Sequence, residues 1–235
     1  MKKLILNFNS KDSKKIKNPK NFLGGKGANL SEMGRMGLPV PPGFTISTKV
    51  CEIFYKDKKK LNKNLISQIK KELKLIEKDV SKKFGDLKNP LLLSVRSGAR
   101  VSMPGMMDTI LNLGLNDKTV KALAIKTSNG RFAKDSYRRF IQMYGNVVMG
   151  VEGYHFEELI ENYKLTKGVL LDTDLDESDW DGLIEDFKRT VREKAKKDFP
   201  QDVYEQLLGA ISAVFLSWES NRAKVYRKLN QIPAE

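Results

Sequence analysis

Two segments of the sequence combine glycine with a cationic side chain at a spacing suited to binding an anion. In the first segment, Lys26 lies among Gly24, Gly25 and Gly27, just before a helical spacing begins. Backbone N–H groups at a glycine-rich turn that enters a helix can cradle an anion, and a lysine adds a point charge. The segment is not a Walker A loop, because Lys26 is followed by glycine rather than by serine or threonine. On spacing alone, a plain loop-to-helix turn with an exposed lysine is an equally good interpretation.

The second segment, SVRSGARVSMPGMMDT over residues 94–109, places Arg96 at the end of an apolar run. An arginine there is costly to bury without a partner, so it reaches solvent, pairs with an acid or meets an anionic ligand. In open α/β sheets, ligands gather at the carboxyl ends of strands, and a flexible loop can close over them. The alternative is a structural ion pair between Arg96 and Asp108.

A further pair of arginines, Arg138 and Arg139, follows Asp135 at spacings of three and four residues. On a helix these spacings allow ion pairs with Asp135, and the residues alone favour that interpretation for both arginines. His155 is the only histidine, and its position in a helical pattern predicts a histidine on a helix surface rather than a catalytic group.

The composition is that of a globular protein with a strongly basic first part. Residues 1–90 carry 22 lysines and arginines against 8 acidic residues, within a net charge of +14. Almost all of these cations are lysines, whereas base-reading surfaces favour arginine, so the charge does not favour nucleic-acid binding. One cysteine excludes an internal disulfide framework and a cysteine zinc site. No apolar run approaches the roughly 18 residues of a membrane-spanning helix, and no signal peptide is apparent, so a cytoplasmic protein without a membrane partner is expected.

The elements expected to position these residues alternate between strands and helices at first, and helices dominate later. Strands are predicted over 4–8 and 44–46, and an apolar run over 91–96 predicts a strand buried on both faces. Helices are predicted from Thr48 as N-cap to Tyr55, over 65–80, over 131–149, from Ser178 as N-cap, and from Leu207 to Trp218. The fold class is therefore α/β (α+β). Residues 1–114 form an α/β subdomain, 115–200 a helical insertion, and 201–235 a helix that returns to the first subdomain.

Three long motifs resemble one enzyme family. LGGKGANLSEMGRMGLPVPPGFTIST, LLLSVRSGARVSMPGMMDTILNLGLND and RFAKDSYRRFIQMYGNVVMGV are similar to the N-terminal nucleotide-binding domain of the pyruvate, phosphate dikinases. The resemblance runs from about residue 4 to the end and includes VFLSWESNRAKVYRKLNQIP. Phosphoenolpyruvate synthase and the glucan, water dikinases share the first motif but resemble the SMPGMMDT segment less well.

The resemblance implies a phosphotransferase that converts ATP, phosphate and pyruvate into AMP, pyrophosphate and phosphoenolpyruvate. It implies an ATP-grasp-like domain that binds ATP with Mg²⁺ and passes the β-phosphoryl group to a histidine on a separate domain. The fold expected here is thus a partial ATP-grasp-like nucleotide-binding domain with a helical insertion subdomain.

Family roles carry over to individual residues of this chain. Lys26 matches a lysine that contacts nucleotide phosphates, Arg96 an arginine needed for transfer, and Arg139 an arginine that helps to bind the terminal phosphate. The resemblance implies the catalytic role for Arg96, and the segment that approaches the triphosphate contains Gly105, Asp108 and Thr109. Lysine and arginine suit phosphoryl transfer, which chiefly requires positioning and charge neutralisation.

The chain also departs from the family pattern. The acidic magnesium ligands and the Thr-Ser-His segment of the family are expected beyond residue 235, so no metal ligand is assigned here. We expect this sequence to be a portion of a longer protein and to be inactive alone. Its expected partners are ATP, phosphate and the phosphohistidine domain of the same chain, and the longer protein is expected to form a homo-oligomer. The alternatives are the nucleotide-binding domain of a phosphoenolpyruvate synthase and a non-catalytic basic module that binds nucleic acid.

Overall fold

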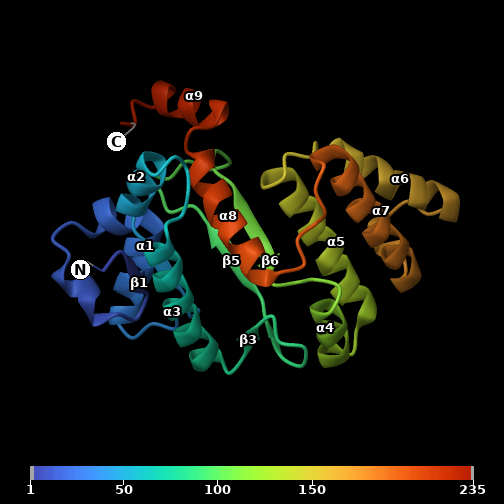
Figure 1. Cartoon of the computed structure of the whole chain (residues 1–235), viewed down its shortest axis with the longest axis horizontal. Helices are drawn as coiled ribbons and strands as arrows, with labels where there is room; N and C mark the ends of the chain where they lie inside the picture. Colours follow the sequence, from blue (N-terminus) through green and yellow to red (C-terminus); the bar gives the residue numbers. More distant parts are fainter. Residues whose placement is uncertain (1–2, 234–235) are drawn as a thin grey trace. The chain divides into compact units, whose positions relative to one another are not determined.

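The computed structural model describes residues 3–233 and shows a mixed α/β chain, mostly helical, with small two-stranded sheets (Figure 1). The chain divides into two compact units. Unit 1 contains the residues up to Ser81, Arg96–Asp108 and the residues from Ser212 onward, and unit 2 contains Lys82–Val95 and Thr109–Ile211. Across residues 3–233, none of the helices combines the length and apolar composition needed to cross a bilayer.

Unit 1 is built on a short antiparallel strand pair with helices packed against it. Its elements are β1 Ile5–Asn7, the 3-10 helix η1 Lys11–Lys15, α1 Pro19–Arg35, β2 Phe44–Ile46, α2 Thr48–Lys56, α3 Lys63–Val80 and α9 Asn221–Leu229. Strands β1 and β2 pair with Leu6 opposite Thr45. The core consists of apolar side chains that exclude solvent, among them Ile5, Leu23, Val50, Phe54, Ile69 and Leu73. The amphipathic stripe predicted for 65–80 is confirmed, because its apolar side chains supply the buried face of α3.

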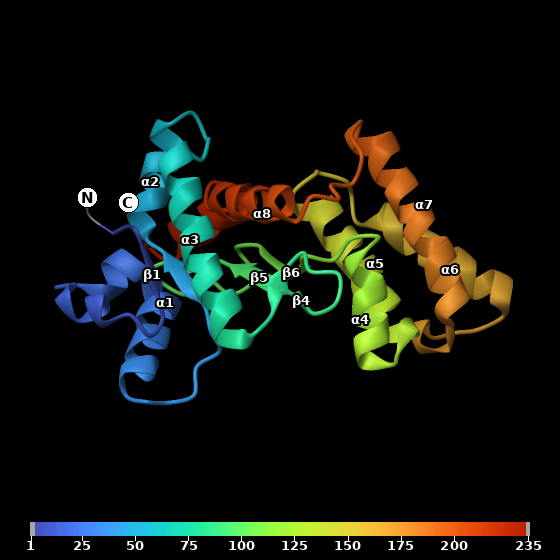
Figure 2. The same ribbon diagram turned by 60° about the horizontal axis from the view of Figure 1, so that its bottom comes forward.

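Unit 2 is a helical assembly with two small sheets. Its elements are β3 Lys83–Phe84, β4 Pro90–Leu91, β5 Leu93–Arg96 up to Val95, β6 Thr109–Leu113, α4 Thr119–Thr127, α5 Gly130–Val147, α6 Tyr154–Lys167, the 3-10 helix η2 Asp172–Asp174, α7 Glu177–Ala195 and the first part of α8 Val203–Ser217. Strand β3 pairs parallel to β4, and β5 pairs with β6. Helix α5 packs between α4 and α7, and α6 packs on α7 (Figure 2). The core contains large aromatic side chains from these helices, namely Tyr137, Phe140, Phe156, Trp180 and Phe187.

The apolar run over 91–96 does not form the expected strand. It forms parts of two short strands, β4 and β5, and the burial of Leu93–Arg96 alternates between half-buried and exposed. The prediction of a strand buried on both faces is therefore wrong. Alternation of burial is typical of a strand that has one face toward solvent, so Arg96 reaches the surface without a buried charge.

Two helix starts also differ from the prediction. Thr48 is the first residue of α2 rather than its cap, and its hydroxyl donates a hydrogen bond to the Asn21 carbonyl at 2.6 Å. Helix α7 is capped by Asp176 rather than by Ser178, because the Asp176 carboxylate accepts the N–H groups of Ser178 and Asp179. The Asp179 carboxylate accepts the Asp176 N–H in return, which completes a reciprocal capping box.

Candidate functional site

The glycine-rich segment contains a kink at Gly24 that separates two helical parts of α1, so a glycine turn leads into the part that ends at Arg35. Helix α1 begins at Pro19, and Gly24 interrupts it with φ 71° and ψ 173°. That backbone conformation is essentially restricted to glycine. A Cβ atom on Gly24 would lie 1.4 Å from the carbonyl oxygen of Gly98, so only glycine allows the two segments to approach so closely.

A backbone hydrogen bond joins the same two segments. The Gly25 N–H donates to the Ala99 carbonyl at 2.9 Å, so this N–H is occupied by the chain itself. Both partners belong to unit 1. The structure therefore brings the glycine-rich segment into direct contact with the segment that follows Arg96.

Two cations adjoin this contact along the chain. Lys26 directly follows Gly25, and Arg96 lies two residues before Gly98. Both are exposed, and neither forms an ion pair within residues 3–233. Arginine and lysine without acidic partners provide donors for an anionic ligand, and phosphate oxygens can accept such hydrogen bonds.

The segment after Ala99 is tied down at its far end by a residue that the sequence did not indicate. The Asp108 carboxylate pairs with the guanidinium of Arg222 from α9, and Arg222 Nε also donates to the Met106 carbonyl at 3.2 Å. The Asp108 N–H donates to Ser217 Oγ at 3.4 Å. The alternative ion pair between Arg96 and Asp108 is therefore not formed, and Arg96 keeps its charge for another partner.

The middle of this segment is open. Gly105 is exposed with φ 73°, and no atom within 4 Å would meet a Cβ there. Glycine is thus favoured at position 105 by the positive φ angle, and not because a side chain there would clash with a neighbour. Thr109 is half-buried at the start of β6 and belongs to unit 2.

Arg139 lies on α5 in unit 2. Its Nε donates to Asp135 Oδ2 at 3.0 Å, and the same carboxylate accepts a bond from Arg138 Nε through Oδ1 at 2.8 Å. The ion pairs expected from helical spacing are therefore present for both arginines. They differ in burial, because the Arg138 side chain is 5% exposed and the Arg139 side chain 58% exposed.

The candidate residues do not offer a magnesium site. Within residues 3–233, no group of three histidine, cysteine or acidic side chains could hold a metal ion. Asp108 is the one carboxylate among the predicted site residues, and Arg222 neutralises it. Magnesium requires oxygen ligands, so these residues fit the anionic phosphates and not the cation.

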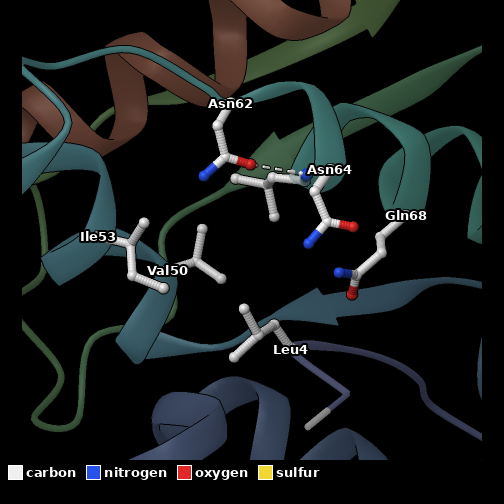
Figure 3. Close-up of a pocket in the computed structure, with 7 residues that line it drawn as sticks. Leu4, Val50, Ile53, Asn62, Asn64 and Gln68 are labelled. Atoms are coloured by element: carbon white, nitrogen blue, oxygen red, sulfur yellow. Dashed lines mark hydrogen bonds between the residues drawn. The ribbon is translucent and has the colours of Figure 1, made fainter. Parts of the chain in front are cut away.

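A cavity of about 110 Å³ elsewhere in unit 1 lacks the chemistry of an anion site (Figure 3). It lies between Leu4 and helices α2 and α3, with apolar walls from Val50, Ile53 and Leu65 and with carboxamides from Asn62, Asn64 and Gln68. The Asn62 side chain is engaged as the cap of α3, where it accepts the Leu65 N–H at 3.0 Å. Among residues 3–233 no lysine or arginine lines the cavity, so the candidate site remains the contact beside Lys26 and Arg96.

His155 lies on α6, as its sequence pattern predicted. It is half-buried, and its ring centroid lies 4.0 Å from that of Tyr154.

Comparison with known proteins places this chain in a class of nucleotide-binding domains. The chain matches the family described as "Pyruvate phosphate dikinase, AMP/ATP-binding domain" over residues 20–67 and 57–235. It is 52% identical over 217 residues to pyruvate, phosphate dikinase from Clostridium symbiosum, covering 92% of this chain and 25% of the relative. It is 52% identical over 231 residues to the chloroplastic enzyme from Flaveria pringlei, covering 98% and 24%. Against the enzyme from Rhizobium meliloti (strain 1021), identity is 49% over 234 residues, covering 100% and 26%.

The chain therefore belongs to the pyruvate, phosphate dikinase family and represents its AMP/ATP-binding domain. It spans about a quarter of the length of the curated relatives that it matches. ATP is thus the ligand class of this domain, and the parent family is one of phosphotransferases.

Proposed function

We propose that this chain supplies the ATP-binding part of an enzyme that converts ATP, phosphate and pyruvate into AMP, pyrophosphate and phosphoenolpyruvate. The proposal rests on one observation above all: Lys26 and Arg96, without acidic partners, adjoin the contact between Gly24 and Gly98. The phosphoryl group then passes to a histidine on another domain of the complete protein. The partial ATP-grasp-like architecture, with residues 115–200 as a helical insertion, is part of the same proposal.

The proposed roles follow from the chemistry of phosphoryl transfer. The reaction needs fixed positive charge around the phosphates and needs little acid–base chemistry from the protein. Lys26 and Arg96 bind phosphate oxygens, and Arg96 stabilises the charge of the transferring group. Arg139 contributes a contact with the terminal phosphate, while the segment with Gly105, Asp108 and Thr109 approaches the triphosphate.

Further features of the complete enzyme are proposed from the resemblance. ATP binds together with Mg²⁺, which supplies additional positive charge at the phosphates, through ligands other than the candidate site residues. The complete enzyme is a cytoplasmic homo-oligomer, and the phosphohistidine domain is its internal partner. The 235 residues alone are inactive, so a coupled assay that detects phosphoenolpyruvate formation by this chain would contradict that part of the proposal.

The central experiment removes one cation from the complete enzyme. In Arg96→Ala, transfer of radiolabel from β-labelled ATP to the histidine is expected to be lost, because the transferring group loses its principal counter-charge. Arg35→Ala is the matched control, since Arg35 is an exposed arginine in the last turn of α1 outside the candidate site. Labelling at the normal rate in Arg96→Ala would exclude Arg96 from the transfer step.

A further inference from the structure

One carboxylate on α5 bridges two consecutive arginines. Asp135 Oδ1 accepts the Nε–H of Arg138 at 2.8 Å, and Asp135 Oδ2 accepts the Nε–H of Arg139 at 3.0 Å. The Asp135 side chain is 20% exposed, so it lies between the buried arginine and the exposed one. Each oxygen thus has its own arginine, and the orientation of the carboxylate links the two guanidinium groups.

The buried arginine holds this carboxylate in place. Arg138 Nη2 donates to Asp172 Oδ2 at 3.1 Å, and Nη1 donates to Gln142 Oε1 at 3.5 Å. Its guanidinium carbon also lies 4.5 Å from the ring centroid of Trp180, within the range of a cation–π contact. Contacts from α7 and the η2 segment therefore fix Arg138, and Arg138 in turn fixes one oxygen of Asp135.

The exposed Arg139 is held through its Nε atom. Arg139 donates to Asp135 through Nε, and within residues 3–233 its terminal nitrogens form no other hydrogen bond. A guanidinium is planar, so a bond at Nε restricts the directions in which both terminal nitrogens can point. Those nitrogens are the ones that form paired hydrogen bonds with phosphate oxygens. Asp135 therefore leaves the phosphate-binding edge of Arg139 available.

The terminal nitrogens of Arg139 keep this arrangement able to bind an anion. A carboxylate that paired with Arg139 alone would cancel its positive charge at short range. Arg139 instead pairs with one oxygen of Asp135, whose other oxygen pairs with Arg138, and Arg138 also pairs with Asp172. The bridging arrangement orients Arg139 without removing its capacity to bind phosphate.

We propose that Asp135 is a positioning residue that orients the terminal nitrogens of Arg139 toward the terminal phosphate of the nucleotide. This inference rests on the proposed function of Arg139. It differs from a purely structural role because Asp135 would act on catalysis only through Arg139.

A double-mutant cycle in the complete enzyme tests the proposal, with kcat/KM for ATP as the readout. Arg139→Met is expected to lower kcat/KM about 100-fold, the scale of a lost charge-assisted contact. Asp135→Asn is expected to lower it about tenfold, because an amide keeps one acceptor oxygen and cannot hold both arginines. The double variant is expected to be no worse than Arg139→Met alone, since Asp135 has nothing left to position. Asp181→Asn, which removes an exposed ion pair with Lys134 on α5, is the matched control and leaves kcat/KM unchanged.

The outcomes separate the inference from the function on which it rests. Wild-type kcat/KM in Asp135→Asn, or losses that multiply in the double variant, would overturn the positioning role while the role of Arg139 stands. Wild-type kcat/KM in Arg139→Met would refute both. If Asp135→Asn does not fold, Asp135→Glu takes its place in the cycle, because it keeps the charge but displaces the carboxylate by one methylene, and the same pattern is expected.

Discussion

Replacing Gly24 by alanine tests whether the kink in α1 depends on the close approach of Gly98. A Cβ atom at position 24 would lie 1.4 Å from the Gly98 carbonyl oxygen, whereas ordinary contact begins at 3.4 Å, so the two segments must separate by about 2 Å. The backbone conformation, φ 71° and ψ 173°, adds strain of about 1–3 kcal/mol for a non-glycine residue. Overpacking adds about 1–3 kcal/mol more. The free energy of unfolding of unit 1 is therefore expected to fall by about 2–6 kcal/mol.

The neighbouring glycine is a matched control. A Cβ on Gly25 would lie 3.4 Å from the Arg100 carbonyl oxygen and 3.5 Å from that of Ala99, both ordinary contacts. Gly25→Ala is therefore expected to change the free energy of unfolding by no more than about 1 kcal/mol, in the stabilising direction, because alanine favours a helix over glycine.

Hydrogen exchange in peptides from α2 and α3 measures the stability of unit 1 separately from that of unit 2. Faster exchange is expected in Gly24→Ala but not in Gly25→Ala. If the free energies of both variants lie within about 0.5 kcal/mol of the wild type, the close approach does not constrain the kink, and the steric argument is refuted.

Three further predictions concern other positions. Burial raises the pKa of Cys51 from 9.0 to about 11, so little of its thiol is present as thiolate at pH 8. Iodoacetamide is therefore expected to alkylate Cys51 more slowly in the folded chain than in the urea-unfolded chain, and equal rates would contradict this prediction. Arg138→Met is expected to lower the free energy of unfolding by roughly 3 kcal/mol, since it removes a buried partner of two carboxylates, whereas Arg139→Met changes it by only about 0.5 kcal/mol in urea titrations. The hydrogen bond from Lys167 and those from backbone N–H groups lower the pKa of Asp176 from 3.8 to about 2, so its contribution to stability is present above pH 3.8 and is lost as the pH falls through about 2. An NMR titration of its side chain that gave an ordinary pKa would contradict the hydrogen bonds from Lys167 and from the backbone N–H groups.

Much of the local structure was predictable because its signal lies within a few residues. The apolar stripe of α3 repeats at helical spacing, and Phe44–Ile46 forms the expected strand β2. Gly37 follows the C-cap of α1 with φ 78°, a conformation that favours glycine at helix ends and is therefore visible in the sequence. The long motifs also predicted the family, which the comparisons confirm.

The partners of the candidate site residues could not be predicted in the same way. Arg222 lies 114 residues from Asp108, and the spacing of neither residue indicates the other. Asp176 and Ser178 are both suitable N-cap residues for α7 in the sequence. The reciprocal hydrogen bonds between Asp176 and Asp179 make Asp176 the cap. The acidic pairing of Arg139 was visible from helical spacing, but the sharing of Asp135 with a buried Arg138 depends on Asp172 and Trp180.

The sequence by itself determined several helices, among them α3 and α5, as well as strand β2 and the family, because periodicity and turn residues act over one or two helical turns. Only the tertiary structure decided that Gly24 lies against Gly98 and that Arg222, rather than Arg96, neutralises Asp108. Those outcomes depend on the path of the chain between distant segments, and no local pattern of residues encodes that path.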